Sequence, residues 1–238
     1  MSIVVSSTAV SSGLTFLQLV NRLKHRCGVV GADLTSVIGQ PASYNRLIDW
    51  INEAWMDIQL RRVDWDWLVT AFSFATVQAQ ATYTDAQAGI TNLSDWKRDS
   101  MRNYLTASGT PTELFLPYMP YEMWRDLYQF GANRTTYTRP NVMSITPGKA
   151  LALGPVPTSG YTIVGEYYAI PTELTLLTDI PRLPSQYHMA IVYRAMMFYG
   201  AFEAASEVFS LGQSEFNKMI NRLESQYLPE IEVAGSDV

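Results

Sequence analysis

The chain has 238 residues, of which 47% are hydrophobic and 16% charged, and its formal net charge at pH 7 is −5. This length suits one or two domains with a substantial core, and the 12% share of aromatic residues argues against disorder. The acidic balance argues against nucleic-acid recognition through phosphates, and no stretch of about eighteen uncharged apolar residues predicts a membrane span.

Residues 1–13 mix β-branched residues with Ser and Thr and show no helical period, which predicts an extended N-terminal arm. Two interpretations of the arm stay open. It is either a frayed terminus or a strand added to the sheet of a neighbouring subunit. The arm has neither a basic start nor a long apolar core, so we expect no secretory signal.

The first predicted helix runs from Leu14 to Cys27. Its apolar residues recur every three or four positions, as on one face of an α-helix. Thr15 and Gln18 have the spacing of a capping box, and Gly28 supplies a stop.

The second predicted helix is the element around which the rest of the chain is organised. It begins at Tyr44, with Ser43 as the expected N-cap, and ends near Arg62. Its apolar face is expected to pack on a helix from the C-terminal part of the chain. The predicted bundle core consists of Leu47, Ile51, Trp55, Ile58, Ile191 and Ala195.

A β-rich segment is predicted over residues 67–182. Polar and aromatic residues alternate from Asp64 to Trp67, which is typical of entry into a strand. A short helix starting at Pro120 interrupts the segment. The predicted strands lie within residues 69–84 (one long strand or two short ones), 95–107 (pairing with the first), 113–118 and 161–171, and residues 141–155 form a hairpin.

Helices resume over residues 183–228, so residues 14–66 and 183–228 together are predicted to form a helical bundle domain. Residues 185–202 are almost wholly apolar and predict a helix buried on most sides, in which Gly200 allows a close helix contact. Residues 206–227 carry one narrow apolar stripe. Residues 229–238 lose the helical period and form a C-terminal tail.

No catalytic or metal-binding constellation is evident. His25 and Cys27 lie two positions apart on a helix, where side chains point away from each other. His188 is expected to be a histidine near a helix cap. Asp64 and Asp66 either share one face of the predicted strand or are, equally, acidic residues of a loop. The short basic runs are expected to be solvated faces: Arg22 with Lys24, His25 and Arg26; Arg61 with Arg62; and Lys97 with Arg98. The single cysteine excludes an internal disulfide and fits a reducing compartment.

Several segments occur in a specific order: LQLVNRLKHRCGVVG, LTSVIGQP, YNRLIDWINEAWMDIQLRRVDWDWL, MPYEMWRDLY, ITPGKALALGPVP, YTIVGEYYAIP and YHMAIVYRAMMFYGAFEAA. In this order they resemble phage head–tail adaptor proteins, over residues 14 to 228. The resemblance implies an α+β fold, in which a bundle of N- and C-terminal helices carries an inserted β-rich domain that is sandwich-like or barrel-like.

The resemblance also implies a non-enzymatic structural virion protein, made in the host cytoplasm, with no cofactor or metal. Its expected partners are further copies of itself in a ring (usually a dodecamer), the portal protein above, and the tail or next connector below. Genome DNA would pass through the channel without sequence-specific binding. By analogy with adaptors whose C-terminal ends enter the portal, the expected portal contacts are Tyr227, Leu228, Pro229, Ile231 and Val233.

An alternative from a different class also remains. The exposed Trp and Tyr residues of the β-rich domain are compatible with a binding module for a ligand such as a glycan. A solution mass measurement separates the two hypotheses, because a ring supports the adaptor and a monomer with sugar affinity supports the module.

Overall fold

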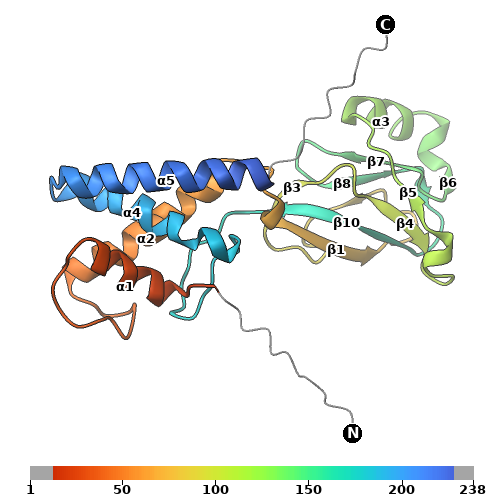
Figure 1. The fold of residues 1–238 in the computed structure, drawn as a ribbon. Helices are drawn as coiled ribbons and strands as arrows, with labels where there is room; N and C mark the ends of the chain where they lie inside the picture. The colour runs from red at the N-terminus through yellow and green to blue at the C-terminus, as the bar shows by residue number, and fades with distance from the viewer. Residues whose placement is uncertain (1–12, 228–238) are drawn as a thin grey trace, which may run out of the picture. The chain divides into compact units, whose positions relative to one another are not determined.

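The computed structural model describes residues 13–227, which form two compact units (Figure 1). Met1–Trp67 and Pro171–Val238 make up the first unit, and the second is Leu68–Ile170. The first unit contains the long helices and the second contains the sheets, so the predicted mixture of α and β structure is confirmed. None of the helices within residues 13–227 combines the length and apolar character needed to cross a membrane. The predicted N-terminal arm, apart from Gly13, lies outside the described residues.

Helix α1 (Phe16–Arg26) begins at the predicted capping box. The backbone N–H of Gln18 donates to Thr15 Oγ1 at 3.3 Å, and the backbone N–H of Thr15 donates to Gln18 Oε1 at 3.0 Å. The helix ends at Cys27, and Gly28 follows with φ +67°, a conformation that favours glycine. Both ends of this helix therefore follow from local sequence.

Helix α2 (Ala42–Leu60) starts earlier than the sequence suggested. Pro41 is its N-cap, and its carbonyl accepts the backbone N–H groups of Tyr44 and Asn45. The prediction that Ser43 is the N-cap was wrong, since Ser43 already lies in the first turn. Because the ring of proline holds φ near the helical value, Pro41 can begin the helix without a side-chain hydrogen bond.

The prediction of a strand from Asp64 to Trp67 was also wrong. The chain forms a 3-10 turn, η1 (Asp66–Leu68), before β-structure begins. Trp65 is fully buried and donates its Nε1–H to the Ile58 carbonyl at 3.1 Å. The Trp67 ring stacks between those of Trp55 and Trp65, with 5.5 Å between centroids on each side. Burial of indole rings against α2 outweighs the local alternation.

The C-terminal part of the first unit consists of η4 (Ser185–Tyr187), α4 (His188–Phe202) and α5 (Ser206–Tyr227). Helix α4 packs against α1, α2 and α5 (Figure 1). Two glycines allow α4 and α5 to approach closely: a Cβ on Gly200 would lie 2.7 Å from Phe209 N, and one on Gly212 would lie 2.8 Å from the Tyr193 carbonyl oxygen. All six residues proposed for the bundle core are buried: Leu47, Ile51, Trp55, Ile58, Ile191 and Ala195.

Residues 171–182 belong to the first unit, although the sequence pattern placed them in the β-rich segment. Two amides of α2 hold their backbone. Asn52 exchanges two hydrogen bonds with Leu174, and Gln59 exchanges two with Thr172, at distances of 3.0 to 3.2 Å. These long-range contacts give no local periodicity, which is why the pattern did not reveal them.

The main sheet of the second unit is antiparallel and is built around β10 (Tyr161–Ala169). Its strand order is β1 (Val69–Ala75), β10, β4 (Arg102–Leu105) and β5 (Leu114–Phe115), and β3 (Leu93–Trp96) also pairs with β10. A second sheet has the order β2 (Thr82–Tyr83), β8 (Leu151–Gly154) and β7 (Val142–Ile145), and a third pairs β6 (Tyr137–Thr138) with β9 (Val156–Pro157).

The strand predictions had mixed outcomes. Residues 69–84 form two strands, β1 and β2, and the predicted hairpin is present as β7 and β8. Residues 95–107 do not pair with β1, because β3 and β4 both occupy the opposite edge of β10. On β1, Phe72 and Phe74 point into the core, where they join Trp96, Met101 and Leu153.

Candidate functional site

In the second unit, helix α3 (Tyr121–Tyr128) and the residues just after it expose large apolar side chains. Trp124 faces inward and is only 1% exposed. Met123, Leu127 and Phe130, at spacings of four and three, are 60%, 42% and 59% exposed. We call these three residues the α3 stripe. Exposed apolar side chains that recur at helical spacing are candidates for a site that another molecule covers.

The helix was predicted from the sequence, but the exposure of its apolar stripe was not. Met123, Trp124 and Leu127 all lie at helical spacing in the sequence, yet of these three only Trp124 is buried. The aromatic residues Tyr121 and Tyr128 flank Trp124, with ring centroids 6.1 and 6.4 Å away. Trp124 faces inward between these two partly buried tyrosines. The helix is too short to bury apolar residues on two faces, so the presence of apolar residues on both indicated that one face would remain exposed.

A hollow of about 490 Å³ adjoins the inward face of α3. Its lining includes Trp124, Tyr128, Phe130 and Tyr137, with Arg134 as its charged residue. The Trp124 Nε1 group is buried and has no hydrogen-bond partner among the described residues. Burial raises the pKa of Tyr128, which therefore keeps its hydroxyl proton. The hollow is aromatic and presents no nucleophile paired with a base.

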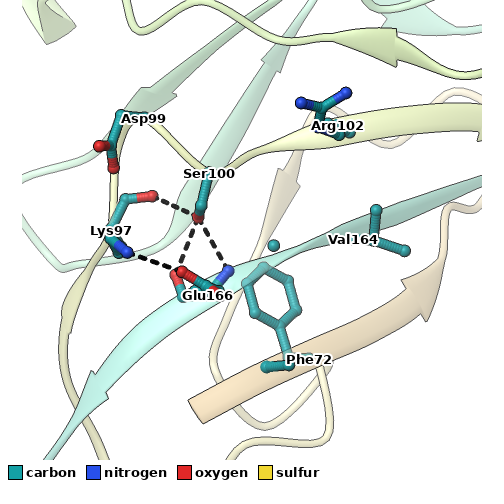
Figure 2. Close-up of a pocket in the computed structure, with 9 residues that line it drawn as sticks. Phe72, Lys97, Asp99, Ser100, Arg102, Val164 and Glu166 are labelled. Atoms are coloured by element: carbon teal, nitrogen blue, oxygen red, sulfur yellow. Dashed lines mark hydrogen bonds and ion pairs between the residues drawn. The ribbon is translucent and has the colours of Figure 1, made fainter. Parts of the chain in front are cut away.

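A second depression, of about 590 Å³, lies on the exposed face of the main sheet. Figure 2 shows Lys97, Ser100 and Glu166 turned toward one another there. Lys97 Nζ lies 2.8 Å from Glu166 Oε2. The Ser100 hydroxyl donates to the Lys97 carbonyl at 2.7 Å and accepts the Glu166 N–H at 2.9 Å.

This polar group does not have the properties of an activated nucleophile. The hydrogen bond that Lys97 donates to the Glu166 carboxylate raises the pKa of Lys97, so Lys97 remains protonated and cannot act as a base toward Ser100. All three hydrogen bonds of the Ser100 hydroxyl are made to backbone groups, the third being a long one to the Glu166 carbonyl at 3.5 Å. The group instead joins the turn between β3 and β4 to β10.

The residues near the end of α1 also have structural partners. His25 Nε2 lies 2.6 Å from Asp33 Oδ1, and this contact is the main cause that lowers the pKa of Asp33. Burial raises the pKa of Cys27 to about 12, which keeps the thiol protonated and a poor metal ligand. Within residues 13–227, no group of three His, Cys, Asp or Glu residues is placed to hold a metal ion.

Lys24 departs from the solvated face that was expected for the basic run of Arg22, Lys24, His25 and Arg26. Its side chain is fully buried, and Nζ donates to the carbonyls of Gly31 and Ala32 at 2.6 and 2.8 Å. The carboxylate of Asp33 lies 3.4 Å away. Lys24 therefore closes the loop after α1 rather than offering a charge to a partner.

The other basic runs are also engaged within the chain. Arg61 pairs with Glu224 at 2.7 Å, and Arg62 with Asp64 at 3.5 Å. The Arg98 guanidinium lies 4.7 Å from the centroid of the Tyr118 ring. Asp64 and Asp66 do not share a strand face, because η1 begins at Asp66. Arg61, Arg62 and Arg98 nevertheless remain exposed, as expected for solvated faces.

Of the expected portal contacts, the structure describes only Tyr227. It is the last residue of α5, and its ring lies edge-on to that of Tyr187, with 6.2 Å between centroids. The neighbouring Gln226 Oε1 accepts the Tyr187 hydroxyl at 2.5 Å. The remaining expected contacts, Leu228, Pro229, Ile231 and Val233, lie outside the described residues. The end of α5 is thus fixed to η4.

Two comparisons with known proteins bear on this geometry. A family model described as "SU10 adaptor protein" matches residues 14–232. No curated protein matches the chain.

Proposed function

Since the chain belongs to the SU10 adaptor protein family, we propose that it is a structural virion protein that connects a phage head to its tail. In this proposal the family arrangement holds: helices from both ends of the chain form a bundle, and the β-rich unit is inserted between them. The continuity of Leu68–Ile170 as one compact unit supports that arrangement. The protein acts by binding other proteins and has no catalytic role.

The observation that carries this proposal is the α3 stripe. Met123, Leu127 and Phe130 expose apolar side chains that a solitary subunit gains nothing by presenting to water. Apolar and aromatic side chains of this kind form the cores of protein–protein interfaces. We propose that subunits assemble into a homo-oligomeric, dodecameric ring beneath the portal, and that the opposite side of the ring binds the tail or the next connector.

The C-terminal end is the proposed portal contact. Tyr227 is fixed by its ring contact with Tyr187, so a segment that begins at Leu228 leaves from a defined point. Leu228, Pro229, Ile231 and Val233 bring apolar surface to a partner, and its burial offsets the entropy lost when the segment orders. Genome DNA passes through the channel, which acidic and neutral residues line, because a basic lumen would retain phosphates. The net charge of −5 supports that lining.

The test uses full-length protein and phage heads that carry the portal but lack the adaptor. We expect the protein to co-sediment with these heads and to form a ring that is visible by electron microscopy. A chain truncated after Tyr227 should keep its thermal stability, because every described contact is retained, and should lose attachment to heads. The control is Leu211→Ser, which removes an exposed apolar side chain from α5 and should attach normally.

Two results would contradict the proposal. If the full-length chain fails to bind portal-bearing heads, the adaptor function is wrong. If the truncated chain attaches with unchanged affinity, the portal contact lies outside the C-terminal segment.

A further inference from the structure

The outer edge of β1 differs from the other edges of the described sheets. β1 has seven residues, whereas β2, β5, β6 and β9 have two each and β7 has four. Short edge strands are a common protection against unwanted pairing, as are Lys, Pro and bulges. The sequence of β1, VTAFSFA, contains no charged residue and no proline. Its pairing with β10 shows no register shift.

The register shows which backbone groups of β1 face outward. Thr76 donates its N–H to Tyr161 O, and the same register continues through Phe74 with Ile163 and Phe72 with Gly165. In an antiparallel ladder the hydrogen bonds to one neighbour come from alternate residues. The N–H and C=O groups of Ala71, Ser73 and Ala75 therefore point away from β10. No described strand lies beyond them in the sheet.

The side chains on this part of β1 leave room for a further strand. Ala71, Ser73 and Ala75 are exposed and small, while Phe72 and Phe74 are buried in the core. An added strand would extend the exposed face of the sheet without meeting a bulky or charged side chain from β1. The edge is thus a template for strand addition.

The chain itself contains a segment with matching chemistry. Residues 2–10, SIVVSSTAV, include five β-branched residues and contain no charged residue, glycine or proline. At about 3.3 Å per residue, nine residues span roughly 30 Å, enough to cover the seven residues of β1. The chain after this segment is anchored, because Leu14 N donates to His188 Nδ1 at 2.8 Å and Phe16 N donates to Asp179 O at 2.7 Å.

We propose that residues 2–10 of a second copy of this chain pair as a strand with the outer edge of β1. The bonds would be main-chain hydrogen bonds to Ala71, Ser73 and Ala75. Each subunit in a head-to-tail assembly would give one strand and receive one, which links successive copies. The inference goes beyond the proposed function, because it requires a second copy but neither a portal nor a tail.

Amide hydrogen exchange on the full-length chain tests the proposal. At high protein concentration, the amides of Ala71, Ser73 and Ala75 should exchange at least roughly tenfold more slowly than at a concentration where the chain is monomeric. Phe72 and Phe74, whose amides face β10, serve as internal references.

Two arm variants identify the occupant. Val4→Pro with Val5→Pro removes two adjacent backbone N–H groups of the segment, one of which would face β1 in either register. This double variant should lose the protection of the three amides. Val4→Thr with Val5→Thr keeps β-branched residues and both N–H groups, and should retain the protection. A synthetic peptide of residues 1–13 should restore the protection in the proline variant.

Three outcomes would overturn the proposal: fast exchange of the three amides in the concentrated full-length chain, equal protection in the proline variant, or protection independent of concentration. The last outcome would mean that each chain covers its own β1. Head attachment is measured on the same samples. If the chain joins portal-bearing heads while the three amides remain unprotected, this inference fails and the adaptor function stands.

Discussion

His188 accepts a hydrogen bond from the backbone N–H of Leu14, 174 positions earlier in the chain, with 2.8 Å between Nδ1 and N. The other ring nitrogen, Nε2, donates to the Leu183 carbonyl at 2.8 Å. This arrangement requires a neutral imidazole with its proton on Nε2. His188 was expected to lie near a helix cap, and as the first residue of α4 it also joins the segment before α1 to the segment before α4.

The protonation of His188 should make stability depend on pH. Burial lowers its pKa below the ordinary value of 6.5, so the unfolded chain binds this proton more readily than the folded chain does. The contribution of His188 to stability is therefore complete above pH 6.5 and should decrease as pH falls below that value. Urea unfolding of the full-length chain between pH 5 and 7.5 measures the dependence. His188→Gln should flatten it, and identical slopes in the variant and the wild type would contradict the assignment.

Trp55→Ala should lower the free energy of unfolding by about 3 to 5 kcal/mol, as expected when a large buried side chain is truncated. Trp55 is fully buried, and its loss also removes one of the two stacking partners of Trp67. The matched control is Trp50→Ala on the same helix, because the Trp50 ring is half-buried and makes aromatic contacts with Tyr199 and the exposed Phe202. Chemical denaturation measures both variants. A Trp55 variant as stable as the wild type would show that α2 is not the central element of the bundle.

Gly212→Ala should destabilise the first unit by roughly 1 to 3 kcal/mol through overpacking. The added Cβ would lie 2.8 Å from the Tyr193 carbonyl oxygen and 3.1 Å from Met196 Cβ, so α5 must move away from α4. The intrinsic helix preference of alanine over glycine, about 1 kcal/mol, opposes this effect. Ser210→Ala, at an exposed position on α5, gives the propensity effect alone. A melting temperature that rises as much in Gly212→Ala as in the control would refute close packing at this position.

Substitution of the α3 stripe should separate assembly from folding. Met123→Ser with Leu127→Ser removes exposed apolar surface, so the melting temperature should change by no more than a few degrees. Trp124→Ala, directed inward on the same helix, should cost about 3 to 5 kcal/mol. Light scattering and co-sedimentation with portal-bearing heads measure assembly. We expect the double variant to assemble poorly despite a normal fold, and normal assembly would show that the stripe contacts no partner.

The parts of the fold that could be predicted are those that local sequence determines. The capping box of Thr15 and Gln18, the stop at Gly28 and the hairpin of β7 and β8 all depend on residues close together in the chain. Periodicity predicted the helices for the same reason, because the buried face of a helix repeats every three or four residues.

The features that could not be predicted depend on distant partners. The burial of Lys24 requires two carbonyl groups to converge on Nζ, and the stack of Trp65 on Trp67 requires α2 to be in place. The choice of β10 rather than β1 as the partner of β3 and β4 is a question of tertiary pairing. The exposure of Met123 and Leu127 was missed because periodicity identifies an apolar face but not whether anything covers it.

The way in which the chain is divided between the two units also constrains the order in which the units can fold during synthesis. Leu68–Ile170 is one continuous stretch and has all of its strands once the ribosome has passed β10. α1 and α2 are made first, yet their packing partner α4 begins only at His188. Helices α1 and α2 can therefore pack fully only after α4 has been synthesised, and the second unit can fold before that point. A nascent chain arrested before α4 would display the apolar face of α2 to chaperones, and the helical unit would be complete only on a finished polypeptide.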